Sequence, residues 1–390
     1  MDVLMILSSK EPDEKHISTS IDPLDTQHDI TFRSNLEDLE DLYDRVVVHE
    51  SASQVLQNSG LARFFEIRIK RADQQLAYAI IERWWYSTNS FHFPNFEIGF
   101  TPLDFVHLTG IPIGNGRRRL EHAATSKWKS RENQQLEDTY FGPLHGYAKY
   151  NKNSPEFPIV CLVNYIKDNP INDENWEIMT RYFLLCVISK VLLARTTTRA
   201  SKGWIASLRD LNAIGNYDWG SACFSHLYSS MSAVARGGKN MCGLAMVLEY
   251  WFYIYFRTLT PFLQEGVPTD VWPAIMIFKK DSLVKLQRGT SKHSLNTARQ
   301  QIELRTIVGT EWQPWSTSMY RDHPDIVHAR EISNQRVAFC NPESDTSIMY
   351  LGERFLRQTK GFITIPISPR ERLEDLATPN DPIDVVEGRY

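Results

Sequence analysis

The chain has 390 residues, of which 42% are hydrophobic and 12% aromatic, with 43 basic and 47 acidic side chains. This aromatic content excludes an intrinsically disordered chain, and 19 glycines and 19 prolines exclude collagen-like or low-complexity sequence. The net charge of −4 gives no overall attraction to nucleic acid or to an anionic membrane, so any such contact requires a local basic patch.

The N-terminal segment is strongly acidic. Residues 1–50 hold 13 acidic and 4 basic side chains, and residues 1–33 predict a flexible acidic arm because their apolar content is low. From Ser34 the pattern changes: Glu37 follows at the spacing of a capping box, and leucines then recur at helical spacing. The sequence therefore predicts one helix that starts at Ser34 and stops before Gly60.

A helix, a hairpin and a short helix are expected next. Residues 73–85 carry one apolar face at helical spacing, and residues 91–100 alternate around a proline and a glycine, which is typical of a β-hairpin. Thr101 and Pro102 are suited to the N-cap and first position of a helix, and Gly110 to its C-terminal end.

The middle of the chain is predicted to be consecutive helices. Residues 114–153 are polar and irregular, which predicts an excursion on the surface. The helices expected after it span residues 157–166, 173–193, 217–235 and 243–256. The last is apolar all round but shorter than the roughly 20 residues that cross a bilayer, so we expect a buried central helix.

The C-terminal third adds an amphipathic segment at residues 283–304 and a hairpin whose strands are residues 336–340 and 347–350. Residues 367–390 are acidic and rich in proline, which predicts a flexible tail. The fold class predicted for residues 34–366 is mainly α, a multi-helix globular domain with one or two short β-hairpins.

Sequence motifs of common enzyme classes are absent. The metallophosphatase patterns, the P-loop and the GxGxxG fingerprint do not occur, and Gly114-Asn115-Gly116 is only a partial match to a phosphate loop. The histidines have no close cysteine partners, and the five cysteines form no CxxC pair. The thiols are therefore predicted to be small apolar core groups in a reducing compartment, and we predict no catalytic residue, metal site or cofactor.

Two charged dipeptides lie within apolar runs. Glu82-Arg83 precedes two tryptophans, and Arg209-Asp210 falls between two leucines. Because burying a lone ion costs much free energy, we expect these four side chains to form buried or half-buried ion pairs that fix helix register.

Other charged residues are candidates for binding. A helix is expected to end at Arg236-Gly237-Gly238, where the arginine either neutralises the carbonyl end of the helix, the favoured alternative, or reaches a partner. A basic stretch around Trp128 is a candidate nucleic-acid contact, a nuclear-import patch or a solvated loop. Its cations are Arg117, Arg118, Arg119, Lys127, Lys129 and Arg131.

Two long blocks of sequence, in the right order and at the right distance, resemble the plant mobile domain family. The first block includes Glu82, Arg83, Trp84, Phe91, His92, Asp104, Gly110, Pro112 and Gly114. The second includes Arg209, Asp210, Tyr217, Trp219, Gly220, Arg236, Gly237 and Gly238. The resemblance assigns these residues a structural or partner-binding role.

The resemblance implies a nuclear, non-enzymatic protein-interaction domain with roles in meristem maintenance and in silencing of genes and transposable elements. It also implies nuclear protein partners, among them a serine/threonine phosphatase, and no membrane association. Two alternatives remain. One is a pyridoxal-phosphate aminotransferase, for which Lys127 and Lys292 follow serines without ending a recognisable strand. The other is a DNA-binding transposon-derived protein that uses the basic stretch.

Overall fold

The fold is mainly helical, as the sequence predicts. It is known from a computed structural model. The residues that the structure describes are 30–34, 36, 38–67, 73–94, 96–123, 128, 130–260, 266, 270–278, 294–342, 346–352 and 384–385. Most of the predicted acidic arm and most of the predicted tail lie outside these residues, but Thr31 and Phe32, at the end of the arm, form a strand.

The helices and strands follow one another along the whole described chain. The α-helices are α2 (Leu39–Val47), α3 (Glu50–Asn58), α4 (Ala62–Phe65), α5 (Gln74–Ile81), α6 (Pro102–Thr109), α7 (Arg131–Tyr140), α8 (Val160–Asp168), α9 (Trp176–Val187), α10 (Trp219–Ala235), α11 (Met246–Phe256), α12 (Leu295–Glu303) and α13 (Pro324–Ile332). Shorter helical turns are η3 (Gly142–Leu144), η4 (Ile188–Leu192), η5 (Lys202–Leu208), η6 (Leu211–Asn216) and η7 (Ala274–Ile277). The strands are β1 (Thr31–Phe32), β2 (Trp84–Trp85), β3 (Ser90–Phe93), β4 (Phe96–Ile98), β5 (Glu156–Pro158), β6 (Arg199–Ser201), β7 (Asn240–Met241), β8 (Arg336–Asn341), β9 (Thr346–Leu351) and β10 (Asp384–Val385).

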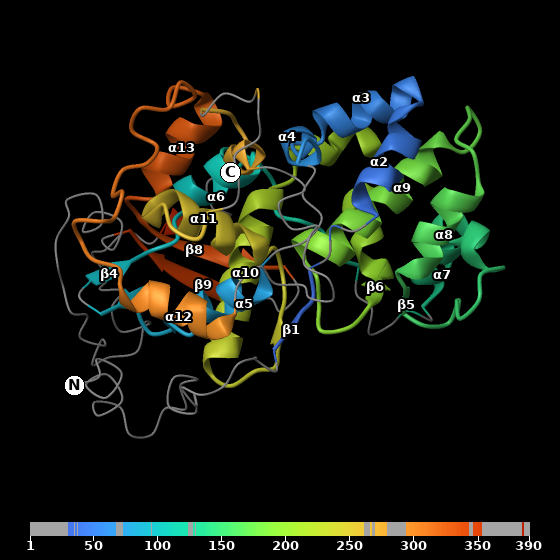
Figure 1. Cartoon of the computed structure of the whole chain (residues 1–390). Helices are drawn as coiled ribbons and strands as arrows, with labels where there is room; N and C mark the ends of the chain where they lie inside the picture. The colour runs from blue at the N-terminus through green and yellow to red at the C-terminus, as the bar shows by residue number, and fades with distance from the viewer. Residues whose placement is uncertain are drawn as a thin grey trace.

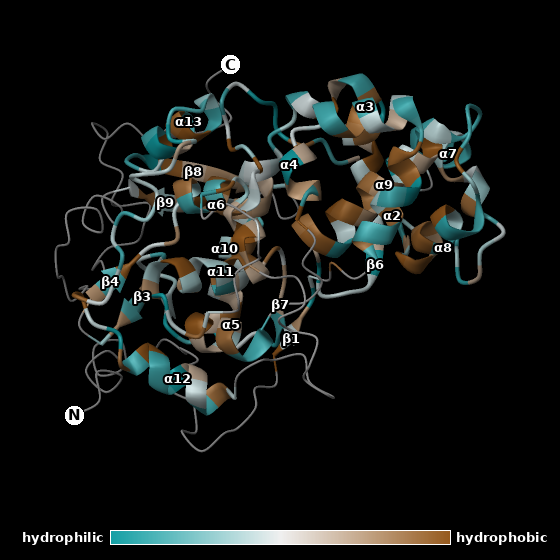
Figure 2. Cartoon of the chain, turned by 45° about the horizontal axis from the view of Figure 1, so that its top comes forward, coloured by the Kyte–Doolittle hydropathy of each residue, from teal (hydrophilic) through white to brown (hydrophobic). Residues whose placement is uncertain are grey.

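The elements form two groups that share one hydrophobic core (Figure 1). One group gathers α5, α6 and α10–α13 around the strands β2–β4 and β8–β9. The other gathers α2, α3 and α7–α9 with the strand pair β5–β6, and α4 lies between the groups. Figure 2 shows hydrophobic and hydrophilic residues alternating around peripheral helices such as α3 and α12, as expected for helices with one buried face.

Aromatic side chains dominate the core of the first group. Trp84, Trp251 and Tyr228 are each essentially inaccessible to solvent. The Trp84 ring lies 4.9 Å from the rings of Phe91 and of Tyr228, in edge-to-face geometry that aromatic pairs favour. Helix α11 is buried along nearly its whole length, which confirms the prediction of a central helix.

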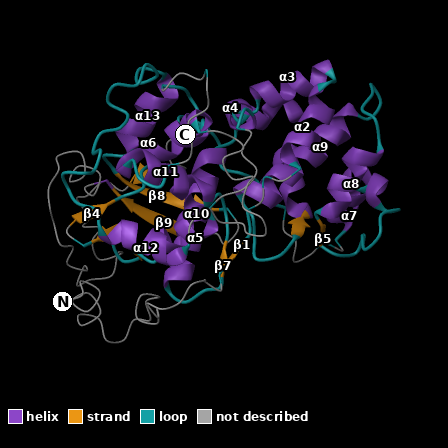
Figure 3. Ribbon diagram, in the orientation of Figure 1, coloured by secondary structure: helices purple, strands orange, loops and turns teal. Residues whose placement is uncertain are grey.

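The strands within the described ranges form small sheets of two or three strands (Figure 3). Strands β2, β3 and β4 make an antiparallel meander, and β8 pairs with β9 in the C-terminal hairpin, so both predicted hairpins are confirmed. Strand β10 pairs in parallel with β8, and β1 pairs in parallel with β7.

Helix α6 begins and ends as the sequence predicts. Thr101 and Asp104 form a reciprocal capping box, Pro102 occupies the first position, and Gly110 follows the helix with φ of 70°. The side-chain oxygen of Thr101 accepts a hydrogen bond from the Asp104 amide, and the Asp104 carboxylate accepts one from the Thr101 amide.

Two helix predictions have wrong boundaries. The helix expected from Ser34 starts at Leu39 and is interrupted at residues 48–49, where His49 has extended backbone geometry and begins α3. The helix expected over 73–85 ends at Ile81, because Trp84 and Trp85 pair with β3 instead. In the second case, strand pairing outweighs the local helical pattern.

The predicted excursion at residues 114–153 lies largely at the surface, with most of its described side chains exposed or half-buried, but it is not irregular throughout. Helix α7 and η3 lie within it, and Trp128, Phe141 and Leu144 belong to the core. Glu137, also within this segment, is buried in a charged pair that is described below.

Replacing Gly110 by alanine is expected to lower the free energy of unfolding by about 1–3 kcal/mol, because the position combines positive φ with close neighbours. An added Cβ would lie 2.6 Å from the Cβ of Arg63 and 2.9 Å from Pro273. Gly116→Ala is the matched control, since Gly116 has φ of 76° but no heavy atom within 4 Å of such a Cβ. Urea denaturation of both variants measures the difference, and equal losses would contradict crowding at Gly110.

Among the described residues, no helix combines the length and the apolar character that crossing a membrane requires. The five cysteines are free thiols, and four of them are buried in the core as predicted.

Candidate functional site

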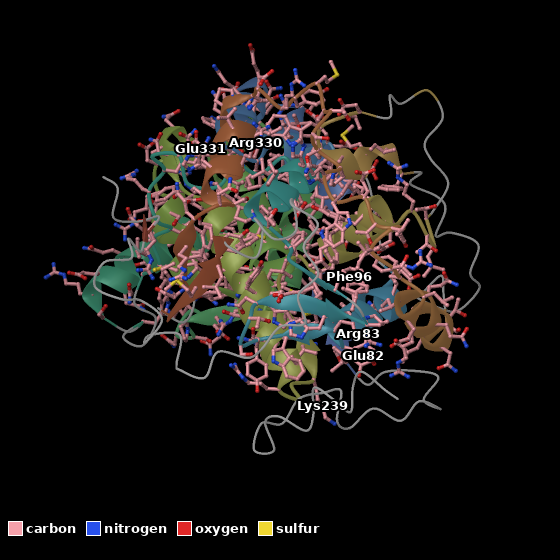
Figure 4. The ribbon with its side chains drawn as sticks, turned by 90° about the vertical axis from the view of Figure 1, so that its left-hand side faces the viewer. Glu82, Arg83, Phe96, Lys239, Arg330 and Glu331 are labelled. Atoms are coloured by element: carbon pink, nitrogen blue, oxygen red, sulfur yellow. The ribbon has the colours of Figure 1, made fainter. Side chains whose placement is uncertain are left out.

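The Glu82-Arg83 dipeptide binds helix α12. The Glu82 carboxylate accepts hydrogen bonds from the Arg299 guanidinium at 3.0 Å from Nε and 2.6 Å from Nη2. Arg83 forms an ion pair with Glu303, one turn further along α12. The prediction of half-buried ion pairs is confirmed here, and Figure 4 shows Glu82 and Arg83 side by side, at the opposite end of the view from Arg330 and Glu331.

The second charged dipeptide behaves differently, and its predicted burial is wrong. Arg209 and Asp210 are both exposed. Asp210 caps η6 by accepting a hydrogen bond from the Asn212 amide at 3.0 Å, and the Arg209 carbonyl accepts one from Arg181 at 3.0 Å. The dipeptide lies at the turn between η5 and η6, so the leucines on either side are buried while the two charged side chains remain exposed.

Asp104 is completely buried and ties three elements together. One carboxylate oxygen accepts hydrogen bonds from the Tyr255 hydroxyl and the Trp315 indole, each at 2.7 Å, while the other accepts from the amide and hydroxyl of Thr101, each at 2.8 Å. Burial raises the pKa of this carboxyl, and the four donors oppose that shift. Every oxygen is engaged, so Asp104 acts as a structural anchor.

The two motif blocks meet where the loop after α6 contacts the start of α10. Asp218 is buried and caps α10: its carboxylate accepts from the Ser221 amide at 2.9 Å and from the Ser221 hydroxyl at 2.6 Å. It also accepts from the Gly114 amide at 2.9 Å, which joins the blocks directly. Burial raises the pKa of Asp218, while these hydrogen bonds and nearby Arg117 lower it.

Close packing reinforces this junction of motif blocks. A Cβ at Gly220 would lie 2.1 Å from the carbonyl oxygen of Pro112, so the first turn of α10 approaches the loop to a distance that only glycine allows. Trp219 is 2% exposed, and its indole donates to the Ile214 carbonyl at 3.1 Å. Tyr217 extends the junction through a parallel bridge with Arg118.

A small cavity of about 20 Å³ lies at the junction of the motif blocks. It is lined by Arg117, Arg119, Leu120, Asp218, Ser221, Ala222, Cys340 and Pro342. A volume of this size holds about one water molecule, so the junction offers no room for an organic substrate.

Two arginines of the basic stretch are engaged with the fold. Arg117 forms an ion pair with Asp325 of α13 at 3.3 Å and donates to the Gly114 carbonyl at 3.2 Å. The Arg118 guanidinium lies 5.0 Å from the centre of the Tyr217 ring. Arg119 and Arg131 are exposed, whereas Lys127 and Lys129 lie outside the described residues.

A nucleic-acid contact through the basic stretch stays a prediction. If it exists, reversing the charge of Arg118 and Arg119 to glutamate is expected to abolish a salt-sensitive affinity for DNA, because phosphate contacts set the salt dependence. Titration of labelled DNA at two salt concentrations measures this affinity, and an unchanged affinity in the double variant excludes the patch as the contact.

The Arg236-Gly237-Gly238 segment ends α10, as the sequence predicts. Gly237 has φ of 93°, and the Arg236 guanidinium lies 4.1 Å from the centre of the Tyr86 ring. The arginine thus stacks on the segment between β2 and β3, a contact that sequence reasoning did not anticipate.

Sequence reasoning also missed a buried ion pair between Lys202 and Glu137, whose side chains are both completely inaccessible to solvent. The ammonium donates to Glu137 at 2.6 Å and to the carbonyls of Asn151 and Lys152 at 3.1 and 3.3 Å. Glu137 accepts further hydrogen bonds from Tyr150 and His145 at 2.6 and 3.0 Å. Burial lowers the pKa of Lys202, and the Glu137 carboxylate opposes that shift.

The sequence gives a sign that one residue of this ion pair, Lys202, is buried. Lys202 precedes Gly203-Trp204-Ile205, so it is a charge at the edge of an apolar run, the same pattern that identifies Glu82 and Arg83. Glu137 carries no such signal, because α7 is mostly polar and Leu136 is the one aliphatic residue of this helix.

His92, a motif residue, belongs to a polar cluster in the first hairpin. The Ser90 hydroxyl donates to Glu97 at 2.5 Å, and the His92 Nε2 atom is 3.0 Å from the Thr88 hydroxyl and 3.5 Å from that of Ser90. A serine, a histidine and a carboxylate are the components of a nucleophilic triad. Here, however, the serine donates to the carboxylate itself, and all of these side chains are buried.

His107 is expected to make stability depend on pH. Its ring stacks on Trp315 at 4.4 Å, and burial, aided by the charge of Arg330, lowers the pKa of His107 from 6.5 to about 3. The unfolded chain therefore binds a proton that the folded chain excludes, so this contribution to stability is complete above pH 6.5 and declines as the pH falls toward 3.

At pH 5 the expected loss from His107 is about 2 kcal/mol. Urea denaturation of the wild type and of His107→Gln at neutral pH and at pH 5 measures it, since the variant lacks the titrating group. Equal pH-dependent losses in the two proteins would show that His107 is not responsible.

The sequence is similar to a known protein family and to several plant proteins. A model of the plant mobile domain family matches residues 60–372. Protein MAIN-LIKE 2 of Arabidopsis thaliana is 23% identical over 70% of this chain and 39% of its own length. Protein MAINTENANCE OF MERISTEMS of the same plant is 20% identical over 67% of this chain and 52% of its own length.

A third relative has a different name. The serine/threonine-protein phosphatase 7 long form homolog of Arabidopsis thaliana is 24% identical over 80% of this chain but only 23% of its own length. The chain thus spans about half of these curated relatives or less. No solved structure matches the chain.

Proposed function

The chain belongs to the plant mobile domain family, and we propose that it is a non-enzymatic protein-interaction module of the nucleus. In this proposal it acts in meristem maintenance and in silencing of genes and transposable elements. The relative named MAINTENANCE OF MERISTEMS supports the first role, and the resemblance described above supports the second.

The observation that carries the non-enzymatic part is the junction of the motif blocks. The buried carboxylate at this junction, that of Asp218, accepts hydrogen bonds from the amides of Gly114 and Ser221. The adjoining cavity holds about one water molecule. Asp104 is likewise bound on both oxygens. Enzyme sites place ionisable groups in a cleft that admits substrate, whereas these groups hold elements together.

The aminotransferase alternative needs a lysine whose amine reaches the cofactor. Lys127 and Lys292, the candidates from the sequence, lie outside the described residues. Lys202 is buried, but its ammonium is already bound to Glu137 and to two carbonyls. These contacts favour a structural lysine over a Schiff-base lysine.

A serine/threonine phosphatase is the proposed partner class. The supporting observation is the relative that is named as a serine/threonine-protein phosphatase. The match covers 23% of that longer protein, so most of it lies outside the match. In this proposal the present chain associates with a separate phosphatase in the nucleus.

Affinity purification from plant nuclei tests the proposal. We expect the tagged chain to recover nuclear proteins, a phosphatase among them, and to be found in the nucleus by fluorescence microscopy. Trp219→Ala, which damages the fold, is the matched control and is expected to lose these partners. An exclusively cytosolic location, recovery of metabolic enzymes alone, or absorbance of bound pyridoxal phosphate in purified protein would overturn the proposal.

A further inference from the structure

A cleft of about 840 Å³ lies away from the junction of the motif blocks. Its lining comes from β1 and the segment after it, from Lys149, from the start of α8, from η4 and from the segment that leads into β6. It is lined by Phe32, Arg33, Asp38, Lys149, Pro158, Ile159, Val160, Val163, Ser189, Lys190, Thr196, Thr197, Thr198 and Arg199. The volume falls within the range of ligand-binding clefts.

The cleft is cationic although the whole chain is acidic. Arg33, Lys149, Lys190 and Arg199 line it, against the single carboxylate of Asp38. That carboxylate is paired with Lys190 at 3.3 Å and with Lys167, from outside the cleft, at 2.8 Å. Arg199 is paired with Glu156, which lies outside the lining, at 3.8 Å. A concave surface with this excess of positive charge attracts anionic groups.

One side of the cleft is built by an unusual helix. Residues Ile188–Leu192 continue α9 as a π-helix, a rare form that is frequent at functional sites. Ser189 of this turn is 6% exposed, and its hydroxyl has no hydrogen-bond partner among the described residues. A buried hydroxyl that lines a cleft without a partner is available to a ligand acceptor.

The lining also contains apolar surface that a purely ionic ligand would leave unused. Ile159 and Val163 are nearly buried, and Val160 is 49% exposed at the cleft. The lining thus combines apolar positions with cations and with three exposed threonines, which suits a peptide that carries both carboxylates and aliphatic side chains. A nucleic acid would instead be expected to find aromatic stacking platforms along a basic groove.

We propose that this cleft binds an acidic, extended peptide segment of a partner protein, with aliphatic side chains on Ile159, Val160 and Val163 and a carboxylate accepting from Ser189. The inference rests on the proposed function and names the surface and the chemistry by which the module recognises its partner.

The serine provides the sharpest test. The probe is a fluorescein-labelled peptide of alternating Glu and Leu, titrated into the full chain and followed by fluorescence anisotropy. Ser189→Ala is expected to weaken binding about tenfold while leaving the urea midpoint unchanged, because the hydroxyl has no partner in the free protein to lose. Ser225→Ala is the matched control: its hydroxyl donates to the carbonyls of Ala222 and Cys340, so stability falls and affinity does not.

The charge of the cleft is tested separately. Lys149→Glu is expected to weaken the peptide about tenfold and to reduce its salt dependence, whereas Lys152→Glu, exposed but outside the lining, changes affinity much less. A peptide with Lys in place of Glu is expected not to bind. Single-stranded DNA that binds this surface in place of the acidic peptide would overturn the proposal.

The remaining outcomes separate this inference from the proposed function. Absence of peptide binding to the full chain overturns the inference. A second result also overturns the inference: the peptide binds only after the acidic residues of segment 1–29 are replaced by their amides. The cleft would then be occupied by the chain's own acidic arm in the wild type. If Ser189→Ala and Lys149→Glu still recover the nuclear partners as the wild type does, the cleft assignment fails while the interaction function stands. If the wild type recovers none, the proposed function fails.

Discussion

Replacing Lys202 by methionine is expected to lower the free energy of unfolding by about 3–5 kcal/mol, because it leaves the Glu137 carboxylate buried without its counter-ion. Both side chains of the pair are inaccessible to solvent, and their charged atoms are 2.6 Å apart. Tyr150 and Trp128 would still donate to the carboxylate, but both are neutral donors. Urea denaturation measures the loss.

The double variant Lys202→Met with Glu137→Gln separates the ion pair from simple packing. Removing both charges is expected to restore part of the stability, since the cost lies in the uncompensated ion. Lys167→Met is the control at a surface pair, where the lysine side chain is 35% exposed beside Asp38, and a loss below about 1 kcal/mol is expected there. Additive losses in the double variant would contradict the coupling.

Trp219→Ala is expected to cost about 3–5 kcal/mol, as large-to-small changes of buried aromatic side chains do. The indole fills the junction of the motif blocks, and its N–H donates to the Ile214 carbonyl. The alanine leaves a cavity between the start of α10 and the loop after α6, two segments that Asp218 and Gly114 also join. Thermal and urea denaturation both report the change.

Trp219→Phe provides the matched control for that prediction. The aromatic bulk remains but the indole donor is lost, so the Ile214 carbonyl lacks its partner and a loss of about 1–2 kcal/mol is expected. If the alanine and phenylalanine variants are equally stable, the indole ring does not fill the junction as described.

Local signals in the sequence predicted the elements whose stability is decided locally. The capping residues of α6 and the turn-forming composition of residues 341–345 are local features of the sequence that mark their elements. Glu82 and Arg83 were recognisable for a related reason: a charge within an apolar run needs a partner, whatever that partner is. The identity of the partners, Arg299 and Glu303, depends on how α12 packs.

Features that depend on distant contacts were missed. Trp84 and Trp85 continue a helical pattern, yet they pair with β3 because the meander buries both rings. Arg209 and Asp210 look buried by their neighbours, yet a turn carries them to the surface. The Lys202–Glu137 pair joins residues 65 apart in sequence, and α7 alone gives no sign that one of its carboxylates faces inward.

The cleft was invisible for the same reason. Its lining comes from residues scattered between Phe32 and Arg199, and the π-helical turn that presents Ser189 reads in the sequence as ordinary helix. The order and the distance of the two motif blocks, by contrast, were visible in the sequence and indicated the family. Their meeting at Gly114 and Asp218 explains why both belong to one structural unit.

The N-terminal helices determine how far this domain can be truncated from its N-terminal side. The family match begins at residue 60, but α2 and α3 precede it and pack on α9, with Leu42, Val46 and Leu56 completely buried. Strand β1, earlier still, pairs with β7 across the fold. A fragment trimmed to the matched boundary would expose the apolar side of α9 and tend to aggregate, so recombinant expression should begin upstream of Ile30.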